Sequence, residues 1–188
     1  MELKLVLIGN PFVGKTCIVN RAVNNVFEKS ISTAGTFYTS KVVRDDIKLH
    51  IWDTAGSEKY KSIVPMYYRE ANIILLVYSV DSSDSFSDLD TWYQSVQDNA
   101  PQNITVILVG NKSDVDSSER QVTTEQGEEY ARRMGMHFYE VSAKSGAGID
   151  ELFEEAPKYY LEAYPKDTIA VIDSKQIVVV TNRSHCKC

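Results

Sequence analysis

Cysteine is scarce in this sequence of 188 residues, which contains only three. Three cysteines cannot form a disulfide framework, and they indicate a reducing, cytosolic compartment. The longest apolar runs, such as residues 73–78 and 104–109, are far too short to cross a bilayer. The first residues lack the basic leader, the long apolar stretch and the cleavage site of a secretory signal, so we expect no such signal.

A basic patch is missing as well. Twenty Lys and Arg against 26 Asp and Glu give a net charge of −6, which argues against nucleic acid as a partner. The three histidines are not placed at metal-ligand spacing, so we expect no structural zinc site. What the sequence does have is a composition of 43% hydrophobic and 24% charged residues, which is typical of a globular domain.

Short apolar segments alternate along the chain with segments whose apolar residues recur at helical spacing. The first kind predicts strands at 3–8, 38–43, 47–52, 72–78, 104–109 and 137–141. The second kind predicts helices at 15–23, around 86–96, up to about 133 behind a capping box of Thr123 and Gln126, and from 149 onward. This order predicts an α/β fold: a mostly parallel six-stranded sheet with one antiparallel strand and helices on both faces. We expect one domain over 1–164 and a flexible tail over 165–188.

The residues from Gly9 to Thr16 match the spacing G-x-x-x-x-G-K-[ST] between a predicted strand and a predicted helix. In such a loop, successive backbone N–H groups surround phosphate oxygens, and glycine permits the dihedral angles that this requires. The N-terminus of the helix adds a positive dipole end. Lys15 supplies a charge for the β- and γ-phosphates and Thr16 a hydroxyl for Mg²⁺, so the segment predicts a nucleotide site.

Three later segments add a metal ligand and a base-recognition site. Asp53 ends a predicted strand and begins the pattern D-x-x-G. In this pattern the Asp53 carboxylate can hold the metal, and the Gly56 N–H can donate to a γ-phosphate. In Asn111-Lys112-Ser113-Asp114, the Asp114 carboxylate only accepts hydrogen bonds. It therefore suits guanine, whose N1–H and amine both donate, and it argues against adenine and against a P-loop kinase or ATPase. Ser142-Ala143-Lys144 follows the last predicted strand, where a backbone N–H can meet the guanine carbonyl.

With these motifs in this order, the sequence resembles small GTPases of the Ras superfamily, and most of all the Rab branch. The Rab-like segments are residues 52–56, 67–71, 78–80 with 84–86, and the C-terminal Cys-Lys-Cys. The resemblance implies that residues 1–164 are a P-loop GTPase G domain. It also implies a GTP/GDP switch that binds GTP with Mg²⁺, hydrolyses it, and recruits effectors to membranes in vesicle trafficking.

The resemblance assigns roles to individual residues of this sequence. The catalytic residues it implies are Lys15, Thr33, Gly56 and Ser57. The Mg²⁺ ligands it implies are Thr16, Thr33 and Asp53. The nucleotide-binding residues it implies are Phe12, Val13, Gly14, Lys15, Thr16, Cys17, Phe27, Thr33, Gly56, Asn111, Lys112, Asp114, Ser142, Ala143 and Lys144, with Phe27 packing against guanine.

The sequence departs from the family pattern beside the phosphates. Ser57 stands where the family has a glutamine that orients the attacking water, and serine is shorter by about 2.5–3 Å. We therefore expect slow intrinsic hydrolysis. Pro11 and Phe12 stand where small residues are usual, and they either obstruct an incoming arginine finger or are tolerated without effect. The alternative function is a GTP-binding interaction module with negligible hydrolysis.

The implied partners are effectors, an exchange factor and a GTPase-activating protein, which would contact two switch loops at 28–35 and 54–70. Cys186 and Cys188 resemble the doubly geranylgeranylated end of Rab proteins, and two lipid chains would give stable anchoring. A metal-binding or free thiol pair is the alternative interpretation. Lipidation also implies a prenylation escort and a GDP-dissociation inhibitor as partners. We expect the protein on the cytoplasmic face of intracellular membranes, cycling with the cytosol.

Overall fold

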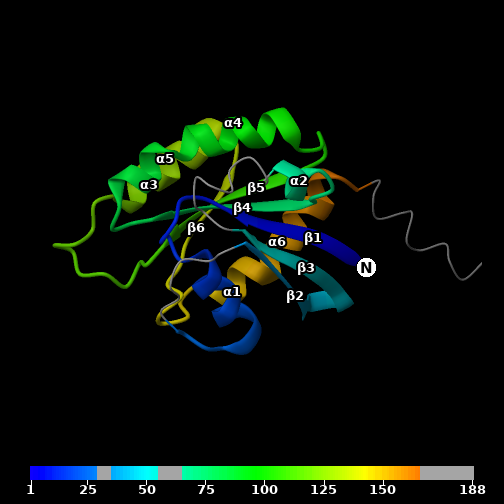
Figure 1. Cartoon of the computed structure of the whole chain (residues 1–188), viewed down its shortest axis with the longest axis horizontal. Coiled ribbons are helices and arrows are strands. Elements are labelled where there is room, and N and C mark those ends of the chain that lie inside the picture. The colour runs from blue at the N-terminus through cyan, green and yellow to red at the C-terminus, as the bar shows by residue number, and fades with distance from the viewer. Residues whose placement is uncertain (29–34, 55–64, 166–188) are drawn as a thin grey trace, which may run out of the picture.

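A six-stranded sheet with the strand order β2-β3-β1-β4-β5-β6 forms the centre of the computed structural model, which describes residues 1–28, 35–54 and 65–165. Its strands are β1 (Glu2–Ile8), β2 (Thr36–Val43), β3 (Ile47–Thr54), β4 (Ile73–Ser79), β5 (Thr105–Asn111) and β6 (His137–Glu140). The helices are α1 (Lys15–Asn24), α2 (Pro65–Tyr68), α3 (Ser83–Ser87), α4 (Leu89–Asn99), α5 (Thr124–Met134) and α6 (Ile149–Ala163), with a 3-10 turn, η1 (Arg44–Asp46), between β2 and β3. Helices α1 and α6 lie on one face of the sheet, and α3, α4 and α5 on the other (Figure 1).

The predicted fold class is confirmed. All strand pairs are parallel except β2 with β3, which are joined through η1 as an antiparallel hairpin. The capping box of Thr123 and Gln126 is present at the start of α5. The helix expected around 86–96 is wrong in one respect: the structure divides it at Asp88 into α3 and α4, and the Ser82 side chain caps α3 by accepting from the Ser85 N–H.

Two hydrophobic cores lie on the two faces of the sheet. Within β1, Leu5 and Leu7 belong to the core under α1 and α6, whereas Val6 and Ile8 belong to the core under α4 and α5. Both kinds of position are fully buried, as expected for a parallel strand that is covered on both faces. No helix within the described ranges combines the length and apolar character needed to cross a membrane.

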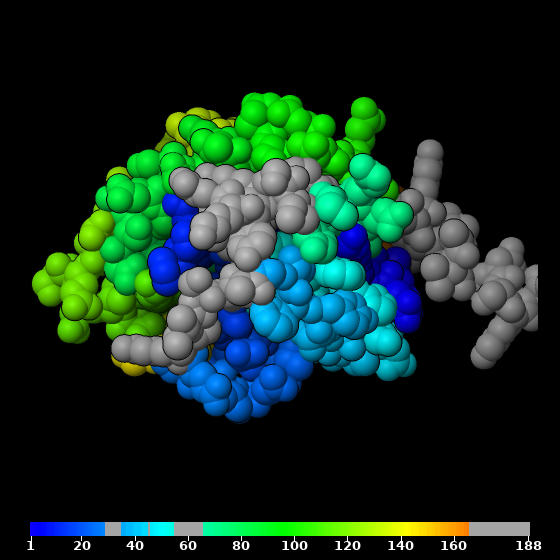
Figure 2. Space-filling model, viewed as in Figure 1, coloured from blue at the N-terminus to red at the C-terminus, as the bar shows by residue number. Residues whose placement is uncertain are grey.

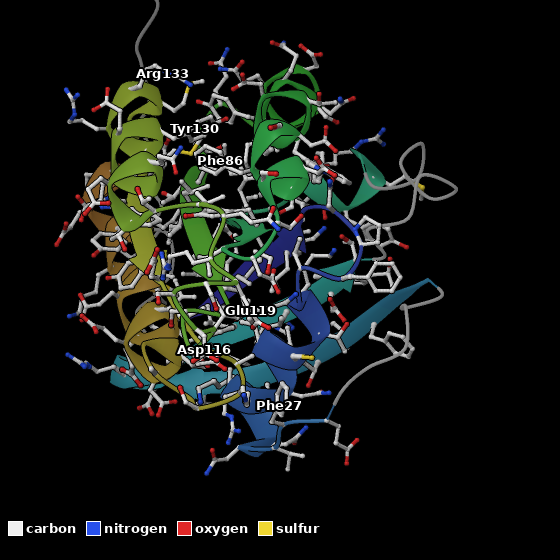
Figure 3. All side chains as sticks on the ribbon, turned by 90° about the vertical axis from the view of Figure 1, so that its left-hand side faces the viewer. Phe27, Phe86, Asp116, Glu119, Tyr130 and Arg133 are labelled. Atoms are coloured by element: carbon white, nitrogen blue, oxygen red, sulfur yellow. The ribbon has the colours of Figure 1, made fainter. Side chains whose placement is uncertain are left out.

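The carboxyl ends of the parallel strands meet at one edge of the sheet, which faces the viewer in Figure 3. Strand β5 extends to Asn111, two residues beyond the predicted end, because Asn111 still pairs with Ser79 of β4. Ligands bind at this edge in open α/β sheets. The predicted phosphate, metal and base motifs lie at or directly after the ends of strands that end here.

Candidate nucleotide-binding site

The loop between β1 and α1 follows a path that ordinary side chains rarely allow. Gly9, Phe12 and Gly14 have φ angles of 136°, 65° and 93°. A Cβ atom on Gly9 would lie 2.0 Å from the Val77 carbonyl oxygen, and one on Gly14 would lie 2.3 Å from the Asn111 side-chain nitrogen. Within the described residues, no side chain caps the start of α1, and the N-terminus of a helix favours an anion.

Lys15 is the first residue of α1 and is only 6% exposed. Its Nζ donates to the carbonyl oxygens of Gly9 and Asn10, each at 2.8 Å. Burial lowers the pKa of Lys15 to about 8, although the charge of Asp53 acts in the opposite direction. The Lys15 ammonium group is therefore held under the loop, where burial disfavours its charge. A negatively charged ligand would stabilise that charge.

Thr16 and Asp53 bring two hard oxygen ligands together beside Lys15. The Thr16 hydroxyl donates to Asp53 Oδ2 at 2.5 Å, and Asp53 Oδ1, although buried, has no hydrogen-bond partner among the described residues. Burial raises the pKa of Asp53, against the hydrogen bond from Thr16 and the charge of Lys15. Mg²⁺ is commonly held by one or two protein oxygens together with phosphates and water, so these two side chains fit the ion.

No group of three or more His, Cys, Asp or Glu side chains in the described part of the chain could hold a metal. A magnesium site completed by phosphates does not need such a group. Thr33, the third expected ligand, lies outside the described residues, as do Gly56 and Ser57.

Asn111, the last residue of β5, joins three segments of the site. Its side-chain nitrogen donates to the Val13 carbonyl of the phosphate loop at 2.8 Å, and its side-chain oxygen accepts from the Ala143 N–H at 3.2 Å. The side chain is 1% exposed, so both partners are needed to satisfy it. A buried amide thus fixes the phosphate loop relative to the two loops that follow β5 and β6.

Asp114 lies in the loop after β5 and is supported by the loop after β6. Its Oδ1 accepts from the Ser142 hydroxyl at 2.5 Å, and its Oδ2 lies 3.3 Å from Lys144 Nζ. Desolvation acts to raise the pKa of Asp114, but the hydrogen bonds from Ser142 and Lys144 outweigh it and hold that pKa below its usual value. The carboxylate therefore stays ionised as an acceptor-only group.

A model of the Ras family matches residues 4–162 of the chain. The chain belongs to the Ras family. Curated relatives place it in the Rab branch of small GTPases. It is 41% identical over 168 residues to "Ras-related protein Rab-15" of Bos taurus, which covers 87% of this chain and 79% of that protein. It is 39% identical over 173 residues to "Ras-related protein SEC4" of Candida albicans, which covers 90% of this chain and 82% of that protein.

Other residues expected at the nucleotide of this Rab-branch GTPase lie around the same edge. Phe12 is 73% exposed at the tip of the phosphate loop, and Val13 is buried. Buried Cys17 donates through Sγ to the Glu28 carbonyl at 3.4 Å. Phe27 follows α1, packs partly buried against the core on that side, and lies below the loop of Asp116 and Glu119 in the view of Figure 3. Lys112, with a φ of 68°, pairs through Nζ with Asp81 at 3.0 Å.

Sequence reasoning missed Arg21, which links α1 to the loop after β6. Its guanidinium donates to the carbonyls of Ala143 at 2.9 Å and Lys144 at 2.7 Å, and also to the backbone and side-chain oxygens of Asn25. A planar fork of five donors suits such a set of acceptors. No local sequence signal marks Arg21, because Ala143 lies 122 positions away along the chain.

Tyr38, Trp52 and Tyr67 form an aromatic surface on β2, β3 and α2. The ring centroids of Tyr38 and Trp52 are 5.3 Å apart, and those of Trp52 and Tyr67 are 5.5 Å apart. Lys4 Nζ lies 5.4 Å from the Trp52 ring, and the Tyr38 hydroxyl lies 2.6 Å from His50 Nδ1. Figure 2 shows the atoms of β2 and β3, in light blue and cyan, beside those of α2 in turquoise on the molecular surface.

Proposed function

We propose that this Rab-branch GTPase is a GTP/GDP switch that binds guanine nucleotide with Mg²⁺, hydrolyses GTP slowly, and recruits effectors to membranes in vesicle trafficking. One observation carries the proposal: buried Asn111 joins the phosphate loop at Val13 to the base loops at Ala143. A single ligand with phosphates at one end and a base at the other matches this arrangement.

At the base end, Asp114 accepts from the guanine N1–H and amine, and Ser142 and Lys144 keep the carboxylate ionised and oriented. A backbone N–H of the loop after β6, whose Ser142 and Lys144 side chains contact Asp114, would meet the guanine carbonyl. Adenine presents an acceptor where Asp114 needs a donor, so a site of this kind rejects it.

At the phosphate end, the loop N–H groups and the start of α1 receive the phosphate oxygens, and Lys15 neutralises charge on the β- and γ-phosphates. Thr16 and Asp53 would hold Mg²⁺, with Thr33 as a further ligand. Mg²⁺ when bound neutralises the charge that develops on the phosphates. In hydrolysis, water attacks the γ-phosphorus and the bond from that phosphorus to the β–γ bridging oxygen breaks. GDP leaves with the charge on that oxygen, and the γ-phosphoryl group leaves as inorganic phosphate, whose oxygens take up the proton of the attacking water.

Ser57 carries the proposal of slow turnover. A serine side chain ends about 2.5–3 Å short of the position that a glutamine amide reaches, so it orients the attacking water poorly. A second candidate, a GTP-binding interaction module with negligible hydrolysis, is favoured by Phe12, whose exposed ring stands on the phosphate loop and narrows the approach of an activating arginine. Gly56 would donate its N–H to the γ-phosphate in either case.

Partners would read the nucleotide state through the switch loops at 28–35 and 54–70. The aromatic surface of Tyr38, Trp52 and Tyr67 extends this region onto the sheet, and Tyr38 is 53% exposed. Exposed aromatic clusters of this kind mark protein interaction sites, so effectors, an exchange factor and a GTPase-activating protein are the partners we assign here.

Residues 165–188 are proposed as a tether for the G domain of residues 1–164. Cys186 and Cys188 would carry two geranylgeranyl groups, added with a prenylation escort and covered by a GDP-dissociation inhibitor during cycling with the cytosol. Intact mass measured on protein from cells tests this directly. Finding both thiols free or metal-bound would exclude the lipid anchor.

The function is tested by nucleotide content and single-turnover hydrolysis. Purified protein should contain GDP or GTP, and it should exchange guanine but not adenine nucleotides at micromolar concentrations in the presence of Mg²⁺. Failure to bind guanine nucleotides would remove the basis of the proposal. The Ser57→Gln variant should hydrolyse GTP faster than wild type, and an equal or slower rate would contradict the role given to Ser57. Turnover too slow to detect with and without activating proteins would favour the interaction module.

A further inference from the structure

The side chain of Asn10, the second residue of the phosphate loop, is held at both ends by α4 and the residue before it. Asn10 Nδ2 donates to Asp88 Oδ2 at 2.7 Å, and Trp92 Nε1 donates to Asn10 Oδ1 at 2.7 Å. Asp88 and Trp92 are one helical turn apart, and the backbone N–H of Trp92 donates to the Asp88 carbonyl. One turn of backbone thus presents a matched acceptor and donor to a single amide, a clamp formed by Asp88 and Trp92.

The clamp binds the phosphate loop at Asn10, directly before Pro11 and the strained residue Phe12. Pro11 follows with a restricted φ, and Phe12 has a φ of 65°, which is the left-handed region that non-glycine residues rarely adopt. Strain of this kind persists only where the surrounding structure holds it, and it gathers at ligand sites. The Asn10 carbonyl also accepts from Lys15 Nζ, so the position of Asn10 helps to set the position of the Lys15 charge.

The chemistry of the clamp makes it rigid. Trp92 is 3% exposed within the core between the sheet and α4, so its indole cannot move without disturbing that core. The bond from Asn10 to Asp88 ends on a carboxylate, and such charge-assisted hydrogen bonds are stronger than neutral ones. The phosphate loop is therefore bound to two residues, Asp88 and Trp92, whose positions are fixed by the packing of α4.

We propose that Asn10 is a positioning residue: Asp88 and Trp92 clamp its side chain, and the clamp holds the phosphate loop in its phosphate-binding shape before a nucleotide arrives. The inference rests on the proposed function, because it assumes that this loop binds phosphates. It goes further by assigning part of the nucleotide affinity to the contact of the phosphate loop with Asp88 and Trp92.

Asn72 provides a matched control within the same chain. Its side chain is also satisfied at both ends, accepting from the Lys4 N–H at 2.8 Å and donating to the Tyr160 hydroxyl at 2.9 Å. Asn72 precedes β4, at the edge of the sheet opposite to the candidate site. An Asn72→Ala change therefore also removes two side-chain hydrogen bonds, both of them neutral, without touching the phosphate loop.

The experiment measures GDP release from the full chain in Mg²⁺ for wild type, Asn10→Ala and Asn72→Ala. The expected result is release about tenfold faster from Asn10→Ala, the effect of one to two lost hydrogen bonds, and a rate within about twofold of wild type from Asn72→Ala. The preference for GDP over inosine diphosphate, which lacks the amine read by Asp114, should stay unchanged in Asn10→Ala because the clamp acts only on the phosphate end.

Trp92→Phe tests the clamp from its other side and keeps an aromatic ring in the core. It should accelerate GDP release less than Asn10→Ala, because it removes only one of the two hydrogen bonds of the Asn10 side chain. Combining it with Asn10→Ala should add little, since Asn10→Ala already removes the bond between Trp92 and Asn10. In ¹⁵N spectra, the indole N–H signal of Trp92, assigned as the one lost in Trp92→Phe, should move in Asn10→Ala.

Equal GDP release from Asn10→Ala and Asn72→Ala, or an indole signal that stays in place, would overturn the inference. Additive effects of Asn10→Ala and Trp92→Phe would do the same. If Asn10→Ala does not fold, Trp92→Phe alone decides, and a GDP release rate equal to wild type then rejects the clamp. A wild-type protein that ignores GDP would reject the proposed function instead, so the two failures are distinguishable.

Discussion

The two ends of the candidate site are built in opposite ways. At the phosphate end, burial lowers the pKa of Lys15 and raises the pKa of Asp53, so the surroundings of both groups disfavour their charges. At the base end, Ser142 and Lys144 hold the pKa of Asp114 below its usual value, against the desolvation of that carboxylate.

In the described part of the chain, the two ends also differ in how far their polar groups are satisfied within the protein. The hydrogen bonds of Asn111, Asp114 and Arg21 satisfy the base end within the protein. Among the described residues, the phosphate end keeps a buried Asp53 oxygen without a hydrogen-bond partner and a Lys15 charge that burial disfavours, and phosphates and Mg²⁺ would compensate both. The side chains of the base end are thus held in place within the protein, whereas a bound nucleotide would stabilise the phosphate end.

The largest expected effect is on base preference, at the base end. Asp114→Asn places an amide donor opposite the guanine amine, whereas xanthine offers a carbonyl there. The ratio of GDP to xanthosine diphosphate affinity should fall by ~10⁴, measured by competition binding. Asp90→Asn, on α4, is the control and should leave the ratio unchanged. A ratio that moves less than about tenfold would mean that Asp114 does not contact the base.

The next effect is at the phosphate end. Lys15→Met removes two or more charge-assisted contacts to phosphate, so GDP affinity should fall by ~10²–10³, as measured by calorimetry. The unfolding free energy of the nucleotide-free protein should change by only ~1 kcal/mol, because losing a buried charge offsets losing its hydrogen bonds. A large destabilisation of the nucleotide-free protein would show that Lys15 is structural, and the two ends would then no longer differ.

A smaller effect is expected for Arg21, which supports the base end from α1. Arg21→Ala should release GDP about three- to tenfold faster and lower the unfolding free energy by ~1–2 kcal/mol, because the carbonyls of Ala143 and Lys144 lose their donor. Stopped-flow release and chemical denaturation measure the two quantities. Arg132→Ala, which removes an exposed side chain on α5, is the control. Unchanged GDP release in Arg21→Ala would separate this residue from the site.

The smallest effect is a proton taken up on binding. Lys15 has a pKa of about 8 in the free protein, and phosphates would raise that pKa, so the bound state holds more protons above pH 8. GDP affinity should therefore fall as pH rises through about 8, by at most about tenfold per pH unit. Calorimetry at pH 8.5 in two buffers of different ionisation enthalpy should detect a fraction of a proton. Binding enthalpies that do not depend on the buffer would contradict the predicted proton uptake.

The elements that depend on local pattern were predictable. The apolar runs of β1 and β4 and the capping box of α5 follow from residue spacing, because a buried strand and a helix start are decided within a few residues. The break between α3 and α4 at Asp88 was not predictable from the spacing of Phe86, Leu89, Trp92 and Val96. That periodicity continues through the break, and Phe86 instead packs edge-on against Tyr130 of α5, as Figure 3 shows.

The candidate site likewise has features that depend on local pattern and features that depend on long-range contacts. Glycine spacing in the phosphate loop and the acceptor chemistry of Asp114 belong to single segments, and the sequence by itself determined them. Only the tertiary structure decided that Asn111 reaches Val13 across 98 positions, that Trp92 reaches Asn10 across 82, and that burial moves the pKa of Lys15. Such contacts and burial depend on sheet register and helix packing, which bring together residues that no local spacing relates.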